Sequence, residues 1–263
     1  MKRALFLPPF DDLADVGVLA GLGAEAEAAG WDGLFLWDHV LRPDPPRPVA
    51  DPWIALAAVA MRTERMRLGP MVTPLARRRP QKLAREVATL DRLSGGRVTL
   101  GLGLGVDTGR ELSAFGEPVI EPAERGDLFD EGLPLLRSML RGERVVHHGR
   151  YFTADDVTLL PPALQQPVPV WMAVRTMNRR PIRRAALGDG LFPIELSPAQ
   201  VGELLAEIRV HRSGGLDGFD VVALASSGYT EEEWAGVGAT WWFADLGPGA
   251  TAFDVRALIH AAG

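Results

Sequence analysis

The amino-acid sequence predicts an α/β fold, a single (β/α)8 TIM barrel that spans residues 1–263. Short apolar runs alternate with longer amphipathic stretches from one end of the chain to the other, which is typical of repeated βα units around a parallel sheet. Eight apolar runs, each followed by a helical pattern, fit within this length and match the barrel in strand number and in size.

The expected strands are short and are bounded by glycine, proline or polar residues. They cover residues 3–7, 33–37, 67–72, 97–102, 168–174, 190–194, 220–225 and 239–244. The expected helices cover residues 15–29, 52–63, 80–93, 123–140, 181–187, 198–212, 230–236 and 253–262. Four helix starts are marked by Pro52, Pro80, Pro181 and Pro198, because a first helical turn tolerates the missing N–H of proline.

The segment from about residue 105 to residue 167 departs from this simple alternation. It holds the helix 123–140, a hairpin pattern around 145–152 and a proline-rich stretch that starts near residue 160. We interpret it as an elaborated loop of one domain, because a domain boundary here would leave neither half with enough strands to close a barrel.

Composition excludes several classes of function. A net charge of −6 gives no basic field for nucleic acid or for an anionic membrane surface. The absence of cysteine excludes disulfides, thiolate metal sites and a cysteine nucleophile. The N-terminal apolar stretch is too short for a signal peptide or a membrane span. We therefore expect a cytoplasmic protein with a small-molecule substrate and, by the usual default, a homodimer.

Active sites of such barrels lie at the C-terminal ends of the strands. The second strand ends in Trp37, Asp38 and His39, and a histidine at the barrel mouth could donate a proton, orient a substrate or interact with the adjacent Asp38. The alternative is a loop histidine that is bonded only to the backbone. We expect Trp37 and Trp171 to be the tryptophans that face a ligand, and the others to belong to the core.

Proline and glycine crowd the ends of the third and fourth strands. Pro70, Met71 and Thr73 indicate a bulge or an unusual peptide bond beside a ligand. Alternate glycines at Gly101, Gly103 and Gly105 would let a flat ring approach the backbone, although the pattern is not a dinucleotide-binding fingerprint.

The fifth strand is followed by a group of arginines. Arg175, Thr176, Asn178 and Arg179 lie at the start of a helix, and we interpret them as a phosphate site. Arg183 and Arg184 fit a solvated basic helix face instead. Apart from Asp38 beside His39 and the His147-His148 pair in the expected hairpin, the five histidines have no neighbours at ligand spacing, so no metal site is expected. No nucleophile elbow is present for a serine hydrolase.

A further set of short motifs extends over almost the full chain in a fixed order. They are AAGWDG (28–33), WDH (37–39), DPW (51–53), RTERMRLG (62–69), SGGR (94–97), GLGLG (101–105), GRYF (149–152), PVPVW (167–171), DG (189–190) and GATWW (238–242). In these motifs the chain resembles the luciferase-like monooxygenase family of flavin-dependent oxidoreductases.

The resemblance implies a barrel that binds FMN or the deazaflavin coenzyme F-420, with the ring at the C-terminal mouth. It also implies a non-prolyl cis peptide bond at the end of the third strand, here at Pro70-Met71, and it places His39 near the reactive edge of the ring. Many members carry paired glycines after the fifth strand, where this chain has Val174 and Arg175.

Four functions follow as hypotheses. The first is a monooxygenase that uses reduced FMN and oxygen on a small organic substrate, with a separate flavin reductase as partner and with His39, Asp38 or Glu195 handling protons. The second is an oxidoreductase that transfers hydride with coenzyme F-420. A non-catalytic flavin-binding barrel is the third, and a cofactor-free hydrolase or isomerase that uses Asp38 and Glu195 is the fourth.

Overall fold

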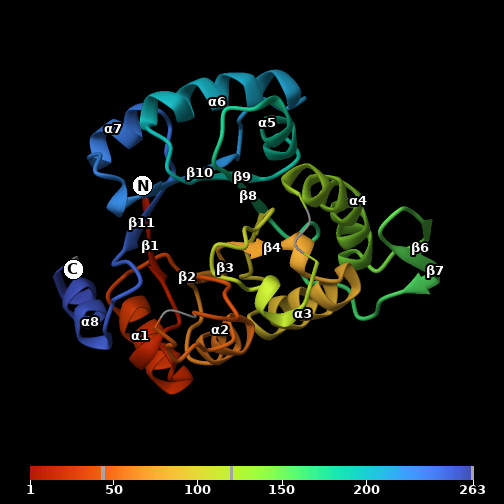
Figure 1. The fold of residues 1–263 in the computed structure, drawn as a ribbon. Helices are drawn as coiled ribbons and strands as arrows, with labels where there is room; N and C mark the ends of the chain where they lie inside the picture. The colour runs from red at the N-terminus through yellow and green to blue at the C-terminus, as the bar shows by residue number, and fades with distance from the viewer. Residues whose placement is uncertain (43–44, 119–120, 262–263) are drawn as a thin grey trace.

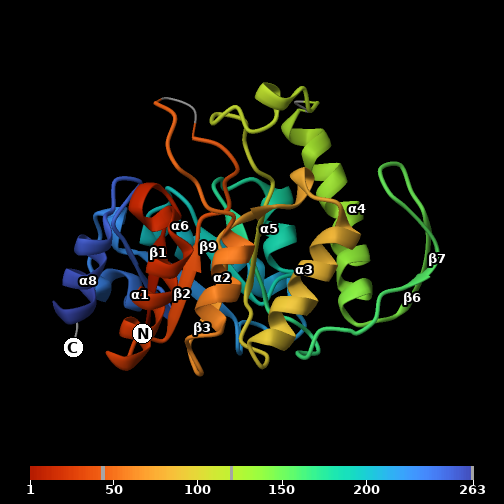
Figure 2. The ribbon, with the colours of Figure 1, turned by 90° about the horizontal axis from the view of Figure 1, so that it is seen from below.

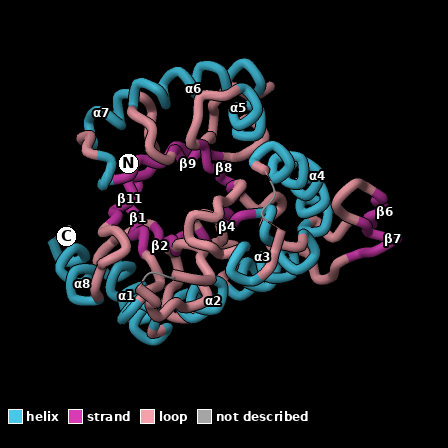
Figure 3. Tube along the Cα trace, in the orientation of Figure 1, coloured by secondary structure: helices cyan, strands magenta, loops and turns pink. Residues whose placement is uncertain are grey.

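The computed structural model describes residues 1–42, 45–118 and 121–261. Its parallel strands form a nearly closed barrel with the order β3-β2-β1-β11-β10-β9-β8-β5-β4, surrounded by helices (Figures 1 and 3). The barrel strands are β1 (Lys2–Leu7), β2 (Gly33–Leu36), β3 (Arg67–Pro70), β4 (Thr73–Pro74), β5 (Leu100–Gly103), β8 (Val170–Val174), β9 (Gly190–Pro193), β10 (Asp220–Leu224) and β11 (Trp241–Asp245). The predicted (β/α)8 barrel is confirmed. The third predicted strand, 67–72, corresponds to β3, which ends at Pro70, and the short strand β4 follows outside the predicted range.

The predicted helices are also present. They are α1 (Val16–Ala28), α2 (Pro52–Ala60), α3 (Pro80–Leu93), α4 (Pro122–Leu140), α5 (Arg179–Ala185), α6 (Pro198–His211), α7 (Glu231–Gly236) and α8 (Ala252–Ala261). Helices α2, α3 and α6 start at the expected prolines, whereas α5 starts at Arg179, two residues before Pro181, with Asn178 as its N-cap residue. The expected end of the last helix, at residue 262, lies outside the described residues.

The barrel closes between β3 and the segment that leads into β5. The Leu68 N–H donates to the Arg97 carbonyl at 3.1 Å, and the Thr99 N–H donates to the Leu68 carbonyl at 2.9 Å. A Cβ atom at Gly69 would overlap the Thr99 carbonyl oxygen, so only glycine permits this approach.

The non-prolyl cis peptide bond is Met71-Val72, so its predicted position at Pro70-Met71 was wrong by one residue. The β2–β3 ladder continues through Pro70, which pairs with Leu36, and the Met71 N–H donates to the Leu36 carbonyl at 2.7 Å. Strand β3 therefore ends at Pro70, directly before Met71 and the cis bond, and β4 then pairs with β5.

Aromatic side chains fill the inside of the barrel. This inner cluster contains Ala4, Phe6, Phe35, Met71, Trp171, Phe192, Val222, Trp241 and Phe243. Trp171 is 1% exposed, and its ring centroid lies 5.4 Å from those of Phe35 and Trp241. The prediction that Trp171 faces a ligand was therefore wrong, because neighbouring rings enclose it.

Two features extend beyond the barrel. The antiparallel strands β6 (Arg144–His148) and β7 (Thr153–Thr158) form the predicted hairpin, which projects past α4 (Figure 1). The segments that follow β2 and β5 extend past the same end of the barrel (Figure 2).

Within the described ranges, no helix combines the length and the hydropathy that a membrane span needs.

Candidate active site

A cavity of about 600 Å³ lies at the C-terminal ends of the barrel strands. Apolar side chains form much of its wall, among them Phe6, Leu102, Met172, Phe192 and Ile194. The predicted site residues that line it are Trp37, Asp38, His39, Met71, Gly103, Gly105, Arg175, Thr176 and Glu195. The cavity therefore brings together predicted residues that are up to 158 positions apart in the sequence, from Trp37 to Glu195.

His39 follows β2 and projects beside two aromatic rings. Its ring centroid lies 5.9 Å from those of Phe10 and Trp37, and its side chain keeps 32% of its exposure. Nδ1 lies 3.1 Å from Oε2 of Glu111, and an ionised carboxylate can only accept, so Nδ1 carries the proton. The carboxylate paired with this imidazole is thus Glu111. The sequence had indicated the adjacent Asp38, which forms no hydrogen bond with the ring.

Glu111 lies in the loop after β5, and its side chain is only 5% exposed. Oε1 accepts the Val40 N–H at 2.6 Å, and Oε2 lies 2.8 Å from Nη1 of Arg77. Burial by itself would raise the pKa of Glu111, but the hydrogen bonds from His39 and Val40 and the charge of Arg77 outweigh it and lower this pKa below its usual value. Glu111 is therefore a carboxylate that the surrounding donors keep ionised.

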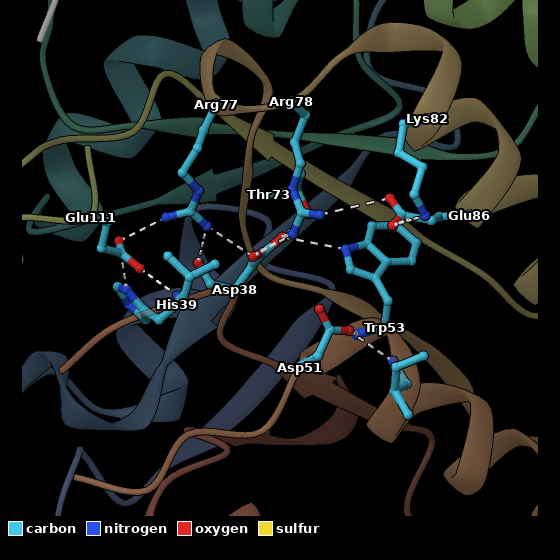
Figure 4. Close-up of polar contacts among 12 residues, drawn as sticks. Asp38, His39, Asp51, Trp53, Thr73, Arg77, Arg78, Lys82, Glu86 and Glu111 are labelled. Atoms are coloured by element: carbon cyan, nitrogen blue, oxygen red, sulfur yellow. Dashed lines mark hydrogen bonds and ion pairs between the residues drawn. The ribbon is translucent and has the colours of Figure 1, made fainter. Parts of the chain in front are cut away.

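Asp38 is the centre of a buried ion network (Figure 4). Its side chain has no exposed surface and accepts from Thr73 Oγ1 at 2.7 Å, from Arg77 Nη2 at 3.0 Å and from Arg78 Nη2 at 2.8 and 2.9 Å. The indole N–H of Trp53 also donates to it, at 3.4 Å. Because these donors occupy both carboxylate oxygens, the structure favours a positioning function for Asp38 over the predicted proton transfer. Thr73, predicted as a cofactor contact, donates to this network and is not among the residues that line the cavity.

The β5 glycines divide into two groups. Gly103 and Gly105 line the cavity, as expected. A Cβ atom at Gly101 would lie 2.6 Å from the Pro70 carbonyl oxygen, so Gly101 and Pro70 belong to the packing between strands. Of the three residues predicted around the end of the third strand, Pro70, Met71 and Thr73, Met71 lines the cavity and the other two do not.

The β8 end of the cavity carries positive charge. Arg175 and Thr176 line it, and Arg175 Nη1 lies 3.3 Å from Glu195 Oε1, with both side chains more than half exposed. Asn178 and Arg179 are exposed and do not line the cavity. Their predicted part in a phosphate site therefore has no support from the cavity's shape.

Arg184 was expected on a solvated helix face, and that expectation was wrong. It is 8% exposed, lines the cavity, contacts the Phe129 ring and forms an ion pair with Asp130 of α4. Burial alone would raise the pKa of Asp130, but hydrogen bonds from Arg184 and Arg180 outweigh it and lower that pKa. The arginine cluster after β8 is thus partly neutralised by α4.

Sequence reasoning missed Glu111, Arg77 and Arg184 as members of the site. Glu111 is 72 positions from its partner His39, and no periodic pattern connects the two. The one available signal was its place in the loop after the glycine-rich strand, because active sites of such barrels lie at the C-terminal ends of the strands. Among the residues with described positions, no group of three or more histidine, aspartate or glutamate side chains could hold a metal ion.

Comparisons with known proteins agree with this architecture. The sequence model of the luciferase-like monooxygenase family matches residues 10–234. An F420-dependent glucose-6-phosphate dehydrogenase of Beutenbergia cavernae is 39% identical over 175 residues, which cover 64% of this chain and 49% of the relative. The chain spans about half the length of the first curated relatives it matches.

Solved structures share the fold at low sequence identity. The coenzyme F420-dependent tetrahydromethanopterin reductase of Methanopyrus kandleri superposes with a TM-score of 0.76 at 17% identity, covering 98% of this chain and 97% of the other. A monooxygenase of Streptomyces bottropensis gives a TM-score of 0.71 at 24% identity, covering 90% of this chain and 78% of the other. These likenesses establish the barrel architecture.

Proposed function

This chain belongs to the luciferase-like monooxygenase family, and from that premise we propose that it is an F420-dependent oxidoreductase that interconverts an alcohol and a carbonyl compound. The observation that carries the proposal is the His39–Glu111 pair at the cavity. Oxidation of an alcohol removes a hydride from carbon and a proton from oxygen. With Nδ1 held by Glu111, Nε2 of His39 is the nitrogen left to accept that proton.

The cavity has features that fit a deazaflavin. Its volume of about 600 Å³ is in the usual range for cofactor sites, and its wall is largely apolar. The indole N–H of Trp37 is buried without an acceptor among the described residues, so it is available to a ligand atom. When bound, coenzyme F420 would supply the hydride acceptor.

Arg175 and Thr176 are the residues we propose for the phosphate of the cofactor, because they line the cavity at the β8 end. Arg184 adds positive charge to the same wall, although Asp130 offsets part of it. The apolar wall near His39 would exclude water from the reacting groups.

The names of the curated relatives favour F420 over FMN, since the Beutenbergia protein and several others of similar identity are F420-dependent dehydrogenases. The monooxygenase that uses reduced FMN, predicted first from the sequence, is the second candidate. It is favoured by the same cavity and the same cationic β8 end, which suit any flavin-like ring with a phosphate. This second function would need a separate flavin reductase.

Equilibrium titration of the purified protein with F420, FMN and reduced FMN tests the proposal, with intrinsic tryptophan fluorescence as the signal. We expect selective binding of F420, followed by F420 reduction when alcohols are added, with glucose 6-phosphate and neutral secondary alcohols in the panel. Selective binding of reduced FMN with oxygen-dependent turnover would support the second candidate. Binding without turnover on any donor would indicate a flavin-binding protein.

A further inference from the structure

We propose that Arg77 is a positioning residue that keeps His39 in its neutral, proton-accepting form by compensating the charge of Glu111. The inference rests on the proposed function for its catalytic meaning. The effect of Arg77 and Glu111 on the protonation of His39 involves residues of this chain alone and can be tested without any ligand.

The guanidinium of Arg77 connects the two carboxylates of the site (Figure 4). Nη1 lies 2.8 Å from Oε2 of Glu111, the same oxygen that accepts the proton of His39 Nδ1 at 3.1 Å. Nη2 donates to the backbone carbonyl and to Oδ1 of Asp38, in both cases at 3.0 Å. The side chain is 12% exposed, so contacts at both of its ends hold it in place.

The position of Arg77 in the chain explains how it reaches this place. It ends the 3-10 helix η2 (Leu75–Arg77), which follows directly after β4. Strand β4 pairs with β5, and the loop after β5 carries Glu111. The two strands therefore deliver the arginine and the carboxylate to the same side of the cavity mouth.

The two charges near the imidazole act on it in opposite directions. A buried carboxylate alone beside a histidine stabilises the charged imidazolium, which has no lone pair to accept a proton. A cation on the same carboxylate oxygen opposes this effect, while the Glu111 oxygen still accepts the Nδ1 hydrogen. Glu111 thus sets the tautomer, and Arg77 favours the neutral ring, in which Nε2 keeps its lone pair.

Other charged groups near His39 lie on different elements. Arg42 and Arg47 both lie over the Phe10 ring, and Arg47 is neutralised by an ion pair with Asp11. The remaining ionisable groups that line the cavity are Arg125, Arg175, Arg184, Glu195 and Asp245. Of the two arginines that contact Asp38, it is Arg77 that also contacts Glu111.

The neighbouring Arg78 provides a matched control. It belongs to the same buried network and contacts both oxygens of Asp38, but its other ion pair is with Glu86, at 3.7 Å. Arg77→Met and Arg78→Met each remove one cation from Asp38. Only Arg77→Met also removes the guanidinium that contacts Glu111.

The test is an NMR titration of the histidine ring signals in the ligand-free protein, with His39 assigned from the spectrum of His39→Asn. We expect the midpoint of the His39 titration to rise by about one pH unit in Arg77→Met and to return toward the wild-type value in Arg77→Lys. Arg78→Met should leave this midpoint in place. Glu111→Gln should move it in the opposite direction, to lower pH, which keeps the test usable if Arg77→Met does not fold.

Turnover gives a second measurement. Below the new midpoint, kcat/KM of Arg77→Met should fall by about tenfold, with recovery at higher pH. Equal His39 midpoints in folded wild-type protein and Arg77→Met would overturn the inference, as would equal shifts in the Arg77 and Arg78 variants. The proposed function fails separately, through absence of F420 binding or turnover, because the ligand-free titration depends on neither.

Discussion

Arg78 holds Asp38 through a single nitrogen that lies 2.8 Å from one carboxylate oxygen and 2.9 Å from the other, with the Asp38 side chain fully buried. Removal of the carboxylate charge would take from Arg77 and Arg78 the buried anion that they share, and would leave each with one other ion pair. We expect Asp38→Asn to lower the free energy of unfolding by about 3 kcal/mol, measured by urea denaturation. Asp155→Asn, a change at a carboxylate that is 83% exposed, should have no measurable effect. Equal stabilities of the two variants would contradict this account of Asp38.

The ionised state of Glu111 makes part of the stability dependent on pH. Its folded-state pKa lies below the usual value, so its contribution is present above about pH 4.5 and is lost as the pH falls through the folded pKa. We expect wild-type protein to have a higher Tm than Glu111→Gln at neutral pH, with a gap that narrows on acidification. Calorimetry at several pH values measures this gap. A gap that widens in acid would show that Glu111 is bound in its protonated form.

The two arginines predicted from the sequence as phosphate ligands should behave differently. Arg175 precedes helix α5 and lines the cavity, whereas Arg179 is the first residue of α5 and does not line it. We expect Arg175→Ala to raise the dissociation constant for F420 about tenfold in a fluorescence titration. Arg179→Ala should change it little. The reverse order would favour the phosphate site as the sequence placed it.

Closure of the barrel depends on a glycine. A methyl group at Gly69 would overlap the Thr99 carbonyl oxygen, whereas one at Gly21 of α1 would meet no atom within 4 Å. We expect Gly69→Ala to lose about 4 kcal/mol or more of stability, or to fail to fold. Gly21→Ala should gain about 0.5–1 kcal/mol, because alanine is the better helix former. Thermal melts of both variants compare them directly, and a tolerated Gly69→Ala would refute the close approach.

Local patterns in the sequence were sufficient for the barrel. Each strand is a continuous apolar run because the helices cover one face and the inner aromatic cluster covers the other, so the strand signal is strong. Proline marked the starts of α2, α3 and α6 correctly. The exception is α5, which begins at Arg179 after an asparagine whose side chain makes no capping hydrogen bond, so Pro181 was given undue weight as a start signal.

The candidate site was only partly predictable. His39, Trp37 and Arg175 were found because they follow strand ends, which is a local property. Glu111 and Arg77 belong to the site because they contact each other across the cavity mouth. They come from separate segments, and no sequence spacing predicts that these segments meet. The burial of Arg184 could not be predicted either, because nothing in the sequence around it shows that α4 covers it.

The imidazole and its partner carboxylate are carried by two different loops at the cavity mouth. His39 follows the end of β2, whereas Glu111 lies in the loop after β5, in which the Leu112 N–H donates to Asp107 Oδ1 at 2.7 Å. Loops at barrel mouths are the parts that vary when such scaffolds acquire new substrates. In this protein an exchange of the loop after β5 would also replace Glu111, the carboxylate that binds His39. Substrate preference and pH optimum would therefore change together. Engineering them independently would require the stretch from Asp107 to Glu111 to be retained while the rest of the loop is replaced.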